Sequence, residues 1–496
     1  MYYHYYGKST YLTLKSDMSL KSKLVTGVFW SAVEKYSSTA VALIVSAVLA
    51  RLVSPEEFGI VSLASVMIAF FSIFTSMGIV PAIIQRNDLT SKNLDSIFTY
   101  TIILGTIVAL LFFSCSWFIS SFYNNVQLIY VCQLLSLNLF LSSINLVPNA
   151  LMLKNQRFKL IAIRTLVIQI VGCSLAIWAA YMGWGVYALL ISPLLSLLLM
   201  LVFNLYNYPR AIDWTFDKEP LKRIFSYSAY QFLFEMVNYF SRNLDKLIIG
   251  RSLNMSALGY YDKSYRLMLM PLQQITSVIS PVLQPVLSSL QEQKREMGEK
   301  YNKLIIFIGH ISFPLAVFLY FSAFELINIV FGNNWNPSVP TFKILALSLP
   351  LQMILSTSGS IFQASNTTNL MFFVGIRNTI STVFCLIIAV SLFSSIEAVA
   401  WSWVISLTIN FIMSYHTMYH KVFESSLKSM VSQFRMPLLS AIIMISLLVL
   451  QEILFSVDNI YLSFAVKCFV AMVSMAILLF GLMRFSVTNI IKSLRS

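Results

Sequence analysis

The sequence predicts an all-α polytopic membrane protein of about fourteen transmembrane helices, arranged as two pseudo-symmetric six-helix lobes plus two C-terminal helices. Three observations support this fold class. The 496-residue chain is 58% hydrophobic and only 11% charged, with a mean hydropathy of +0.77. Apolar runs long enough to cross a bilayer follow one another along almost the whole chain. Residues near the start also recur at a fixed offset in the second half.

The apolar runs are separated by short polar connections, so each is expected to form one membrane span. The fourteen predicted spans are 23–50, 57–84, 94–122, 126–152, 160–182, 185–208, 222–250, 257–290, 303–330, 340–364, 369–393, 397–420, 434–455 and 460–484. The breaks inside 300–365 are the hardest to place, because Pro314, Pro340 and Pro350 interrupt the pattern there.

Basic residues cluster in every second connection, from the N-terminal segment to the C-terminal tail. The alternate connections, such as 123–127, 182–185 and 393–397, have almost none. By the positive-inside rule, this asymmetry predicts that both termini are cytoplasmic. The net charge of +14 is thereby explained by membrane topology, and nucleic acid is not an expected partner.

The offset between the repeated residues is 200. Arg51, Gly59 and Pro81 recur as Arg251, Gly259 and Pro281, and VLARLVSPEEFG resembles IIGRSLNMSALG. This pattern indicates a duplication. With six helices in each half, the halves share one topology and are related by an axis along the membrane normal. The predicted domains are an N-lobe at 1–210, a C-lobe at 211–423, and two further helices with a cytoplasmic tail at 424–496.

The turn at 54–59 carries helix-start signals. Ser54 is placed as an N-cap, Pro55 suits the first helical position, and two glutamates favour the positive end of the helix dipole.

The stretch 231–267 is apolar enough for a membrane, yet it is rich in charge. Its charged residues are Glu235, Arg242, Asp245, Lys246, Arg251, Asp262, Lys263 and Arg266. A charge at the bilayer centre costs about 2.5–3.5 kcal/mol, so these side chains must face protein, water or a ligand. Spacings of 3 or 4 place Glu235, Asn238, Arg242, Asp245 and Ile249 on one face. We therefore expect an aqueous cavity beside this helix.

Other charges also fall within predicted spans. Glu34 and Lys35 lie about 17 Å beyond Lys23 at 1.5 Å per residue, too deep to snorkel comfortably. Glu235 is the repeat counterpart of this pair. Arg51 and Arg251 have two open interpretations, as anchors at helix ends or as cations that face the cavity.

The remaining intramembrane charges have simpler interpretations. Asp262 and Arg266 are spaced to pair with each other, and Asp245 with Lys246 fits either the cavity or a salt bridge between lobes. Arg164, Arg377, Lys343 and Lys467 are expected to snorkel near span ends.

No enzyme motif is present: there is no Walker A loop, HExxH or GxSxG, and the loops are too short for a catalytic domain. The five cysteines are scattered through apolar segments and are expected to be small buried hydrophobes. The sequence therefore predicts a transporter without a cofactor, whose driving force is an ion gradient (H⁺ or Na⁺) or downstream consumption of its product.

Two long stretches resemble a known family. LARLVSPEEFGIVSLASVMIAFFSIFTSMGIVPAIIQRNDLT and NYFSRNLDKLIIGRSLNMSALGYYDKSYRLMLMPLQQI are similar to matching parts of Wzx-type polysaccharide flippases. GWGVYALL at 183–190 fits as well. These flippases serve O-antigen, capsule and exopolysaccharide pathways and belong to the multidrug/oligosaccharidyl-lipid/polysaccharide exporter superfamily.

The resemblance implies a V-shaped pair of lobes that opens alternately to each face of the bacterial cytoplasmic (inner) membrane. The cargo would be a polyprenyl-pyrophosphate-linked oligosaccharide, with membrane lipid, a polysaccharide polymerase and a chain-length regulator as further partners. Cationic cavity residues would bind the pyrophosphate or acidic sugars. The positions assigned to this role are Arg51, Arg242, Lys246, Arg251, Arg266 and Lys35, and the candidates for ion coupling are Glu34, Glu235 and Asp245.

Three alternatives remain. A flippase for a peptidoglycan lipid precursor also needs cations for a pyrophosphate. A drug or cation antiporter of the same superfamily should favour unpaired acidic residues, whereas Arg and Lys predominate in this chain. A membrane-embedded polysaccharide polymerase or ligase needs a sizeable catalytic loop at the outer face.

Overall fold

The computed structural model describes residues 20–76, 78–212, 236, 239–240, 242–455 and 457–477, and in these residues all regular secondary structure is helical. Ten of the described helices are long and apolar enough to cross a membrane, or eleven if one bent pair forms a single span. The all-α polytopic fold is thereby confirmed. The count of fourteen stays a prediction, since most of 222–250 and the end of 460–484 lie outside the described residues.

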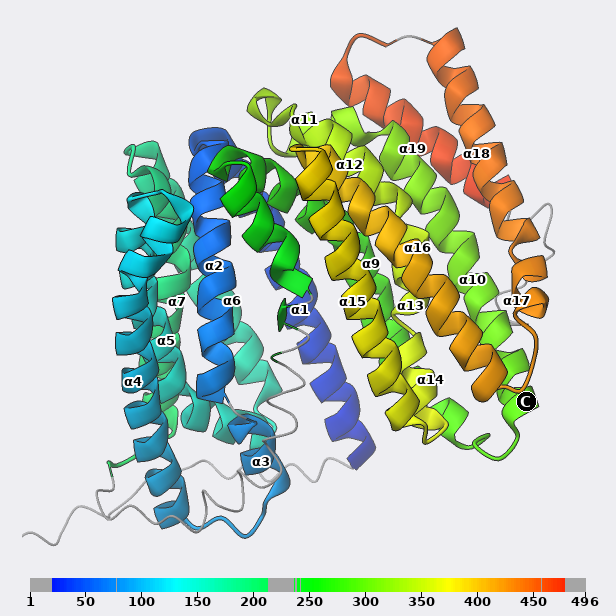
Figure 1. Cartoon of the computed structure of the whole chain (residues 1–496). Helices are drawn as coiled ribbons and strands as arrows, with labels where there is room; N and C mark the ends of the chain where they lie inside the picture. The colour runs from blue at the N-terminus through cyan, green and yellow to red at the C-terminus, as the bar shows by residue number, and fades with distance from the viewer. Residues whose placement is uncertain are drawn as a thin grey trace, which may run out of the picture.

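The first half of the chain forms one bundle (Figure 1). Its helices are α1 (Leu20–Leu52), α2 (Pro55–Ser76), α3 (Ile79–Gln85), α4 (Ser91–Tyr123), α5 (Gln127–Lys154), α6 (Phe158–Tyr181), η1 (Gly185–Tyr187) and α7 (Ala188–Asn207). Local signals set several of these ends. For example, Thr90 and Asn93 form a capping box before α4, and Asn124 ends it in the left-handed conformation with φ 53°.

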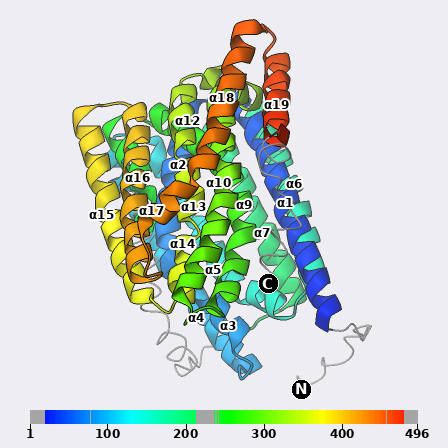
Figure 2. The ribbon, with the colours of Figure 1, turned by 90° about the vertical axis from the view of Figure 1, so that its right-hand side faces the viewer.

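The second bundle begins with a helical segment at 242–252, the described end of the seventh predicted span. Its helices are α9 (Met255–Ser288), α10 (Lys294–Phe321), α11 (Ala323–Val330), η2 (Asn333–Trp335), α12 (Ser338–Leu347), α13 (Leu349–Leu355), α14 (Ser358–Ala364), α15 (Thr368–Leu392) and α16 (Ile396–Lys421). Outside this bundle follow α17 (Leu427–Gln433), α18 (Arg435–Leu454) and α19 (Ile460–Ile477) (Figure 2).

The proline-rich region 300–365 differs from its prediction. Pro314 lies inside an unbroken α10, and the predicted span 303–330 is divided instead at Ser322, between α10 and α11. The next span is bent by 47° between α12 and α13. Here Pro350 occupies the first turn of α13, where a proline needs no hydrogen-bonding partner for its nitrogen.

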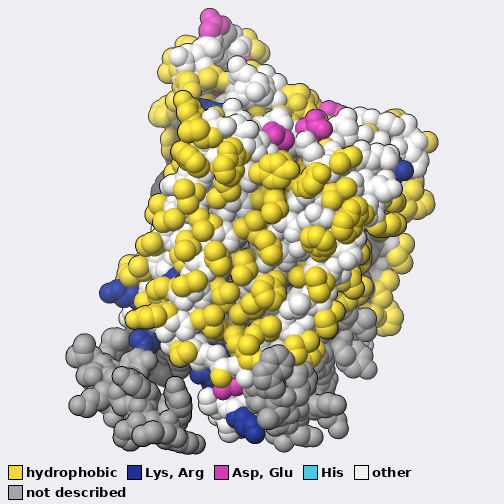
Figure 3. Space-filling model, turned by 90° about the vertical axis from the view of Figure 1, so that its left-hand side faces the viewer, with side chains coloured by type: hydrophobic (Ala, Val, Ile, Leu, Met, Phe, Trp, Pro, Cys, Tyr) yellow, Lys and Arg dark blue, Asp and Glu magenta, His cyan; other side chains and the backbone are white. Residues whose placement is uncertain are grey.

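The connections rich in Lys and Arg lie at one end of the molecule, which we call the basic end; the opposite end is called the far end (Figure 1). A space-filling view of the first bundle shows hydrophobic side chains over its outer face, with Lys and Arg toward the basic end (Figure 3). This distribution matches the asymmetry that the sequence predicts, and an apolar belt of this kind suits a lipid environment.

The two bundles meet at the far end, where α2 and α9 begin. Ser54 caps α2 by accepting a hydrogen bond from the Glu57 backbone nitrogen, and Asn254 caps α9 in the same way through the Ala257 nitrogen. The two helices then cross at a pair of glycines. A Cβ on Gly59 would lie 1.8 Å from the Met255 carbonyl oxygen, and a Cβ on Gly259 would lie 2.0 Å from that of Pro55.

This contact is reciprocal, since each glycine packs against the first residue of the opposite helix. Such mutual contacts are the mark of a two-fold relation. The glycines and the capped helix starts follow the offset of 200 that the sequence contains. The crossing therefore supports the inferred duplication. The described part of α2 ends at Ser76, whereas α9 extends to Ser288.

Candidate substrate pathway between the two bundles

Beyond the glycine crossing, the ends of four helices interlock across the two bundles. The Arg51 guanidinium donates to the Ile329 carbonyl at 2.7 Å, and the Trp335 indole donates to the Ala50 carbonyl at 2.7 Å. Both hydrogen bonds connect the end of α1 to the segment that contains α11 and η2.

The opposite pairing mirrors this arrangement. The Tyr123 hydroxyl at the end of α4 donates to the Leu247 carbonyl at 3.3 Å, and Arg251 lies 5.2 Å from the centroid of the Phe122 ring. The two predicted arginines therefore occupy equivalent positions, each at a helix end and each contacting the other bundle. These contacts and the glycine crossing join the two bundles at the far end, and we call the whole set the gate.

Lys263 lies within the gate and is 5% exposed. Its ammonium donates to the Ser46 hydroxyl of α1 at 2.7 Å and lies 3.8 Å from the centroid of the Phe58 ring. Phe331 and Trp335 also lie close to this ammonium. Three aromatic rings and one hydroxyl thus surround a buried cation between the bundles, a geometry in which cation–π attraction is strongest because water is excluded.

A second charged cluster lies beside the gate on the second bundle. Asp262 forms ion pairs of 2.7 Å with both Lys246 and Arg266, so the predicted Asp262–Arg266 pair is confirmed as part of a larger cluster. Lys246 is nearly buried, whereas the Arg266 side chain is 60% exposed although much protein surrounds it. Because Arg266 binds Asp262 through Nε, the outer nitrogens of its guanidinium remain available to a ligand.

Asp245 points into the second bundle and is 2% exposed. Its carboxylate accepts hydrogen bonds from the Tyr261 hydroxyl at 2.8 Å and the Trp403 indole at 3.0 Å. The backbone nitrogen of Lys246 donates a third, at 2.8 Å.

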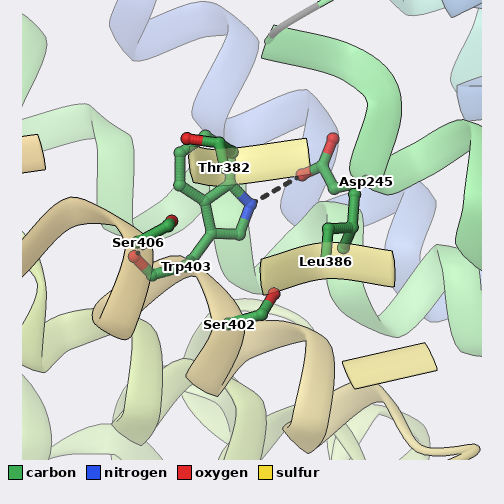
Figure 4. A pocket seen from close by; sticks show the side chains of 6 residues that line it. All are labelled: Asp245, Thr382, Leu386, Ser402, Trp403 and Ser406. Carbon is green, nitrogen blue, oxygen red and sulfur yellow. Dashed lines mark hydrogen bonds between the residues drawn. The ribbon is translucent and has the colours of Figure 1, made fainter. Parts of the chain in front are cut away.

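A small pocket opens beside this carboxylate (Figure 4). Its other lining residues come from α15 and α16: Thr382, Leu386, Ser402, Trp403 and Ser406. Asp245 therefore does not face an open cavity as predicted but packs against protein, and Ile249 on the same face is buried as well. The spacing of 3 and 4 identified a shared face, but α16, distant in sequence, covers it.

The other predicted residues lie apart from this cluster. Arg242 is exposed at the start of the described segment, and Glu235 lies outside the described residues. On α1, Glu34 is half-buried and Lys35 is exposed. The field of Glu34 acts on Arg164 of α6, so this carboxylate has a neighbouring cation in its own bundle.

Two residues expected to snorkel are instead buried in polar clusters. Arg164 is 5% exposed and hydrogen-bonds the side-chain carbonyl of Asn204, which in turn contacts Asn145. Lys467 of α19 forms ion pairs with Glu325 at 2.7 Å and Glu452 at 3.0 Å. Position near a span end does not reveal such partners, because each comes from a distant helix.

Lys263 is the charged residue of the gate to which sequence reasoning assigns no role. The sequence feature that could have identified Lys263 is that it lies in a predicted membrane helix and has no carboxylate three or four residues away to pair with. Phe58 and Trp335, which surround it, lie far off in the sequence, so only the fold brings them together.

Two helical bundles that meet at one end, with arginines at and toward the basic end from their junction, form an arrangement that is also found in solved membrane proteins. The likeness to those structures is one of fold. The chain resembles the lipid II flippase MurJ in an inward closed conformation, with a TM-score of 0.72, 14% identity, and coverage of 91% of this chain and 98% of that one. An inward-facing multidrug resistance MATE transporter gives a TM-score of 0.60 at 15% identity, covering 78% and 94%.

The family follows from the sequence. The family model described as "Polysaccharide biosynthesis protein" matches residues 48–340, more than half of the chain, and the chain belongs to this family. It is 24% identical to the lipopolysaccharide biosynthesis protein WzxC of Escherichia coli, over 85% of this chain and 86% of that protein. It is also 23% identical to the teichuronic acid biosynthesis protein TuaB of Bacillus subtilis, over 80% and 82%.

Proposed function

We propose that this protein is a flippase that moves polyprenyl-pyrophosphate-linked oligosaccharide repeat units across the bacterial cytoplasmic (inner) membrane by alternating access. The observation that carries the proposal is the exposed Arg266 guanidinium below the closed gate, in a chain of the polysaccharide biosynthesis family. A relative, the succinoglycan biosynthesis transport protein ExoT of Rhizobium meliloti, has transport in its name and is 24% identical over 66% of this chain and 67% of that one.

The chemistry of the cargo explains why it needs a protein. A glycan and a pyrophosphate cannot cross the roughly 30 Å hydrocarbon core unaided, since each unpaired hydroxyl costs about 2–7 kcal/mol in an apolar medium. The polyprenyl tail, in contrast, is stable in the bilayer. A hydrated path with fixed positive charge, beside which the tail stays in lipid, meets both needs.

The cationic site that we propose has two levels. Arg242 and Arg266 are exposed in this conformation and would bind the pyrophosphate first, with Lys246 holding Asp262 so that Arg266 stays oriented. Arg51 and Arg251 are engaged in the gate, and opening would release them to receive the head group. Lys35, exposed on α1, would add charge nearer the basic end.

The balance of charge favours an anionic cargo over a cationic drug. From 242 to 266 the chain contains five basic residues (Arg242, Lys246, Arg251, Lys263, Arg266) against two acidic ones (Asp245, Asp262). Both described acids of this stretch are occupied, Asp262 by two cations and Asp245 by three hydrogen-bond donors. A peptidoglycan lipid precursor would fit the same cations, and the family favours an oligosaccharide instead.

For energy coupling we propose Asp245, Glu34 and Glu235. Asp245 is the best supported by its surroundings, because its buried carboxylate lies beside a pocket that contains three hydroxyl groups from Thr382, Ser402 and Ser406. Asp245→Asn, Glu34→Gln and Glu235→Gln should weaken the dependence of transport on an imposed H⁺ or Na⁺ gradient. Unchanged gradient dependence in all three variants would reject this role.

The remaining assignments belong to the same proposal. The basic end would face the cytoplasm with both termini, and the lobes would be 1–210 and 211–423, with 424–496 outside the repeat. A polysaccharide polymerase and a chain-length regulator would act on the flipped product. The protein would work as a transporter rather than an enzyme.

Deletion of the gene tests the proposal. The deletion strain should lose its surface polysaccharide and accumulate the lipid-linked repeat unit on the cytoplasmic side of the membrane. Wild-type protein and the Arg→Lys variants at 242 and 266 should restore export fully or in part, because lysine keeps the charge but loses the bidentate fork. Arg242→Ala and Arg266→Ala, each present at normal abundance, should fail to restore export. Export at the wild-type level by both Ala variants would refute the cationic site.

A further inference from the structure

A polar face on α9 has no explanation in the folding of the helix. Arg266, Gln273, Ser277 and Gln284 are all exposed, at spacings of 7, 4 and 7 residues. At 100° per residue, these four positions fall within about 20° of one line along the helix. They form one continuous face, which we call the α9 track.

The opposite face of α9 is the one that packs. Met268 is buried there, and Leu272, Ile275 and Ile279 contact the same core. The track therefore points away from the core of the second bundle. It lies on a helix that is not among those apolar enough to pass as an ordinary membrane span in the described chain.

The track cannot be lipid-facing at reasonable cost. The side-chain amides of Gln273 and Gln284 have no hydrogen-bond partner in the described part of the chain, and an unpaired amide in hydrocarbon costs about 2–7 kcal/mol. Gly259, which contacts α2 of the first bundle, lies seven residues before Arg266 and so on the same face of α9 as the track. A hydrated space between the bundles is the environment that satisfies these amides.

The repeat shows that the fold does not need this polarity. At the offset of 200, Arg266 and Gln273 correspond to Val66 and Ile73 of α2, the partner helix in the crossing. Both counterparts are apolar, so a helix in this position does not need a polar residue at either of these two positions. The polar track is thus a property of the second lobe alone.

The chemistry of the track changes along its length. Its only charge is Arg266 near the gate; from 267 to 288 α9 contains no charged residue. Amides both donate and accept hydrogen bonds, as sugar hydroxyls do, and Ser277 adds a hydroxyl. From Arg266 to Gln284 the track extends about 27 Å at 1.5 Å per residue, which suits an extended oligosaccharide rather than a pyrophosphate alone.

We propose that the α9 track is the glycan-binding surface of the transporter: Arg266 takes the pyrophosphate, and Gln273, Ser277 and Gln284 hydrogen-bond uncharged, hydroxyl-rich sugars toward the basic end. This rests on the proposed flippase function and adds a separate requirement, which concerns the sugars and not the pyrophosphate. The three neutral residues are thereby assigned as specificity determinants.

The test compares two cargoes in proteoliposomes that contain the full-length chain. One is polyprenyl pyrophosphate with a single sugar, and the other is the complete lipid-linked repeat unit isolated from the deletion strain. The variants are Gln273→Leu, Gln284→Leu and their double variant. Gln291→Leu, an exposed glutamine in the turn after α9, is the matched control, and Gln273→Asn is the conservative variant.

We expect the double variant to flip the complete repeat unit at least tenfold more slowly than wild type, while the single-sugar cargo moves at the wild-type rate. Gln291→Leu should match wild type with both cargoes, and Gln273→Asn should retain most activity. If the double variant flips both cargoes at their wild-type rates, the proposed role of the track is overturned. It is also overturned if the double variant slows both cargoes by the same factor. If wild-type protein flips neither cargo, the flippase proposal itself fails, so the two failures are distinguishable.

Discussion

The glycine crossing at the gate makes a quantitative prediction for Gly59→Ala and Gly259→Ala. The new Cβ of the first variant would lie 1.8 Å from the Met255 carbonyl oxygen, and contacts below 3.0 Å force a displacement. The helices must therefore separate by at least 3.0 − 1.8 = 1.2 Å. Since the opposing atom is a backbone oxygen in a capped helix start, no side-chain rotation relieves the clash.

Overpacking of this kind costs about 1–3 kcal/mol, which lowers the ratio of gate-closed to gate-open protein by roughly 5- to 150-fold. Both alanines collide with the opposite helix at the same crossing. One separation of α2 from α9 relieves both clashes, so the double variant should cost less than the sum of the two single variants.

The assay measures how often the gate opens. In a variant without the five native cysteines, Ser277→Cys provides a thiol on the exposed face of α9 below the gate. A membrane-impermeant maleimide added outside intact cells reaches this thiol only when the far end is open. Gly59→Ala and Gly259→Ala should each raise the labelling rate by about the factor given above and lower export.

Gly359→Ala is the matched control, because a Cβ at Gly359 meets no atom within 4 Å. It should leave both labelling and export at the level of the parent protein. If Gly59→Ala and Gly259→Ala behave like this control, the crossing is not a closed gate and the reasoning is refuted.

Three further predictions concern buried charges. Lys263→Met keeps the packing among the aromatic rings but loses the cation–π attraction and the hydrogen bond to Ser46, about 2 kcal/mol in all. The rate of labelling from outside should therefore rise roughly tenfold or more, and an unchanged rate would contradict a role of Lys263 in closure. Lys467→Met leaves Glu325 buried without its cation and should lower the free energy of unfolding by about 3–5 kcal/mol. The thermal unfolding midpoint in detergent should fall, and adding Glu325→Gln to the same chain should partly restore it. Arg164→Met should lower the same midpoint without changing outside labelling, since its partners all lie in the first bundle; a change in labelling would assign it to the gate.

Much of the fold follows from the sequence because lipid imposes strong rules on it. The length of the apolar runs, the connections rich in Lys and Arg, and the recurrence of Gly59 at Gly259 can all be recognised in the sequence alone. The structure agrees with each of them. Proline was the weaker guide. Pro314 lies inside a continuous α10, where the preceding turn tolerates one missing hydrogen bond, and no local rule distinguishes this from a break.

The candidate site was predictable only in part. The sequence identified the charge-rich stretch and the Asp262–Arg266 pair, since both depend on spacing within one helix. It misplaced Asp245, because the indole of Trp403 that binds this carboxylate is 158 residues away. The aromatic surroundings of Lys263 likewise come from both bundles. Helical periodicity identifies which residues share a face, but tertiary packing decides what covers that face.

In the mechanism that we propose, the chain moves a pyrophosphate-linked glycan along a path on which Arg266 is one of the exposed cations. The most direct measurement is transfer of the lipid-linked repeat unit between leaflets of proteoliposomes, followed as the fraction of glycan that an impermeant oxidant reaches over time. Wild-type protein should expose initially protected glycan, Arg266→Lys should do so more slowly, and Arg266→Glu, at equal reconstitution, should match protein-free vesicles. Glycan that stays protected with wild-type protein, or transfer by Arg266→Glu at the wild-type rate, would contradict the account.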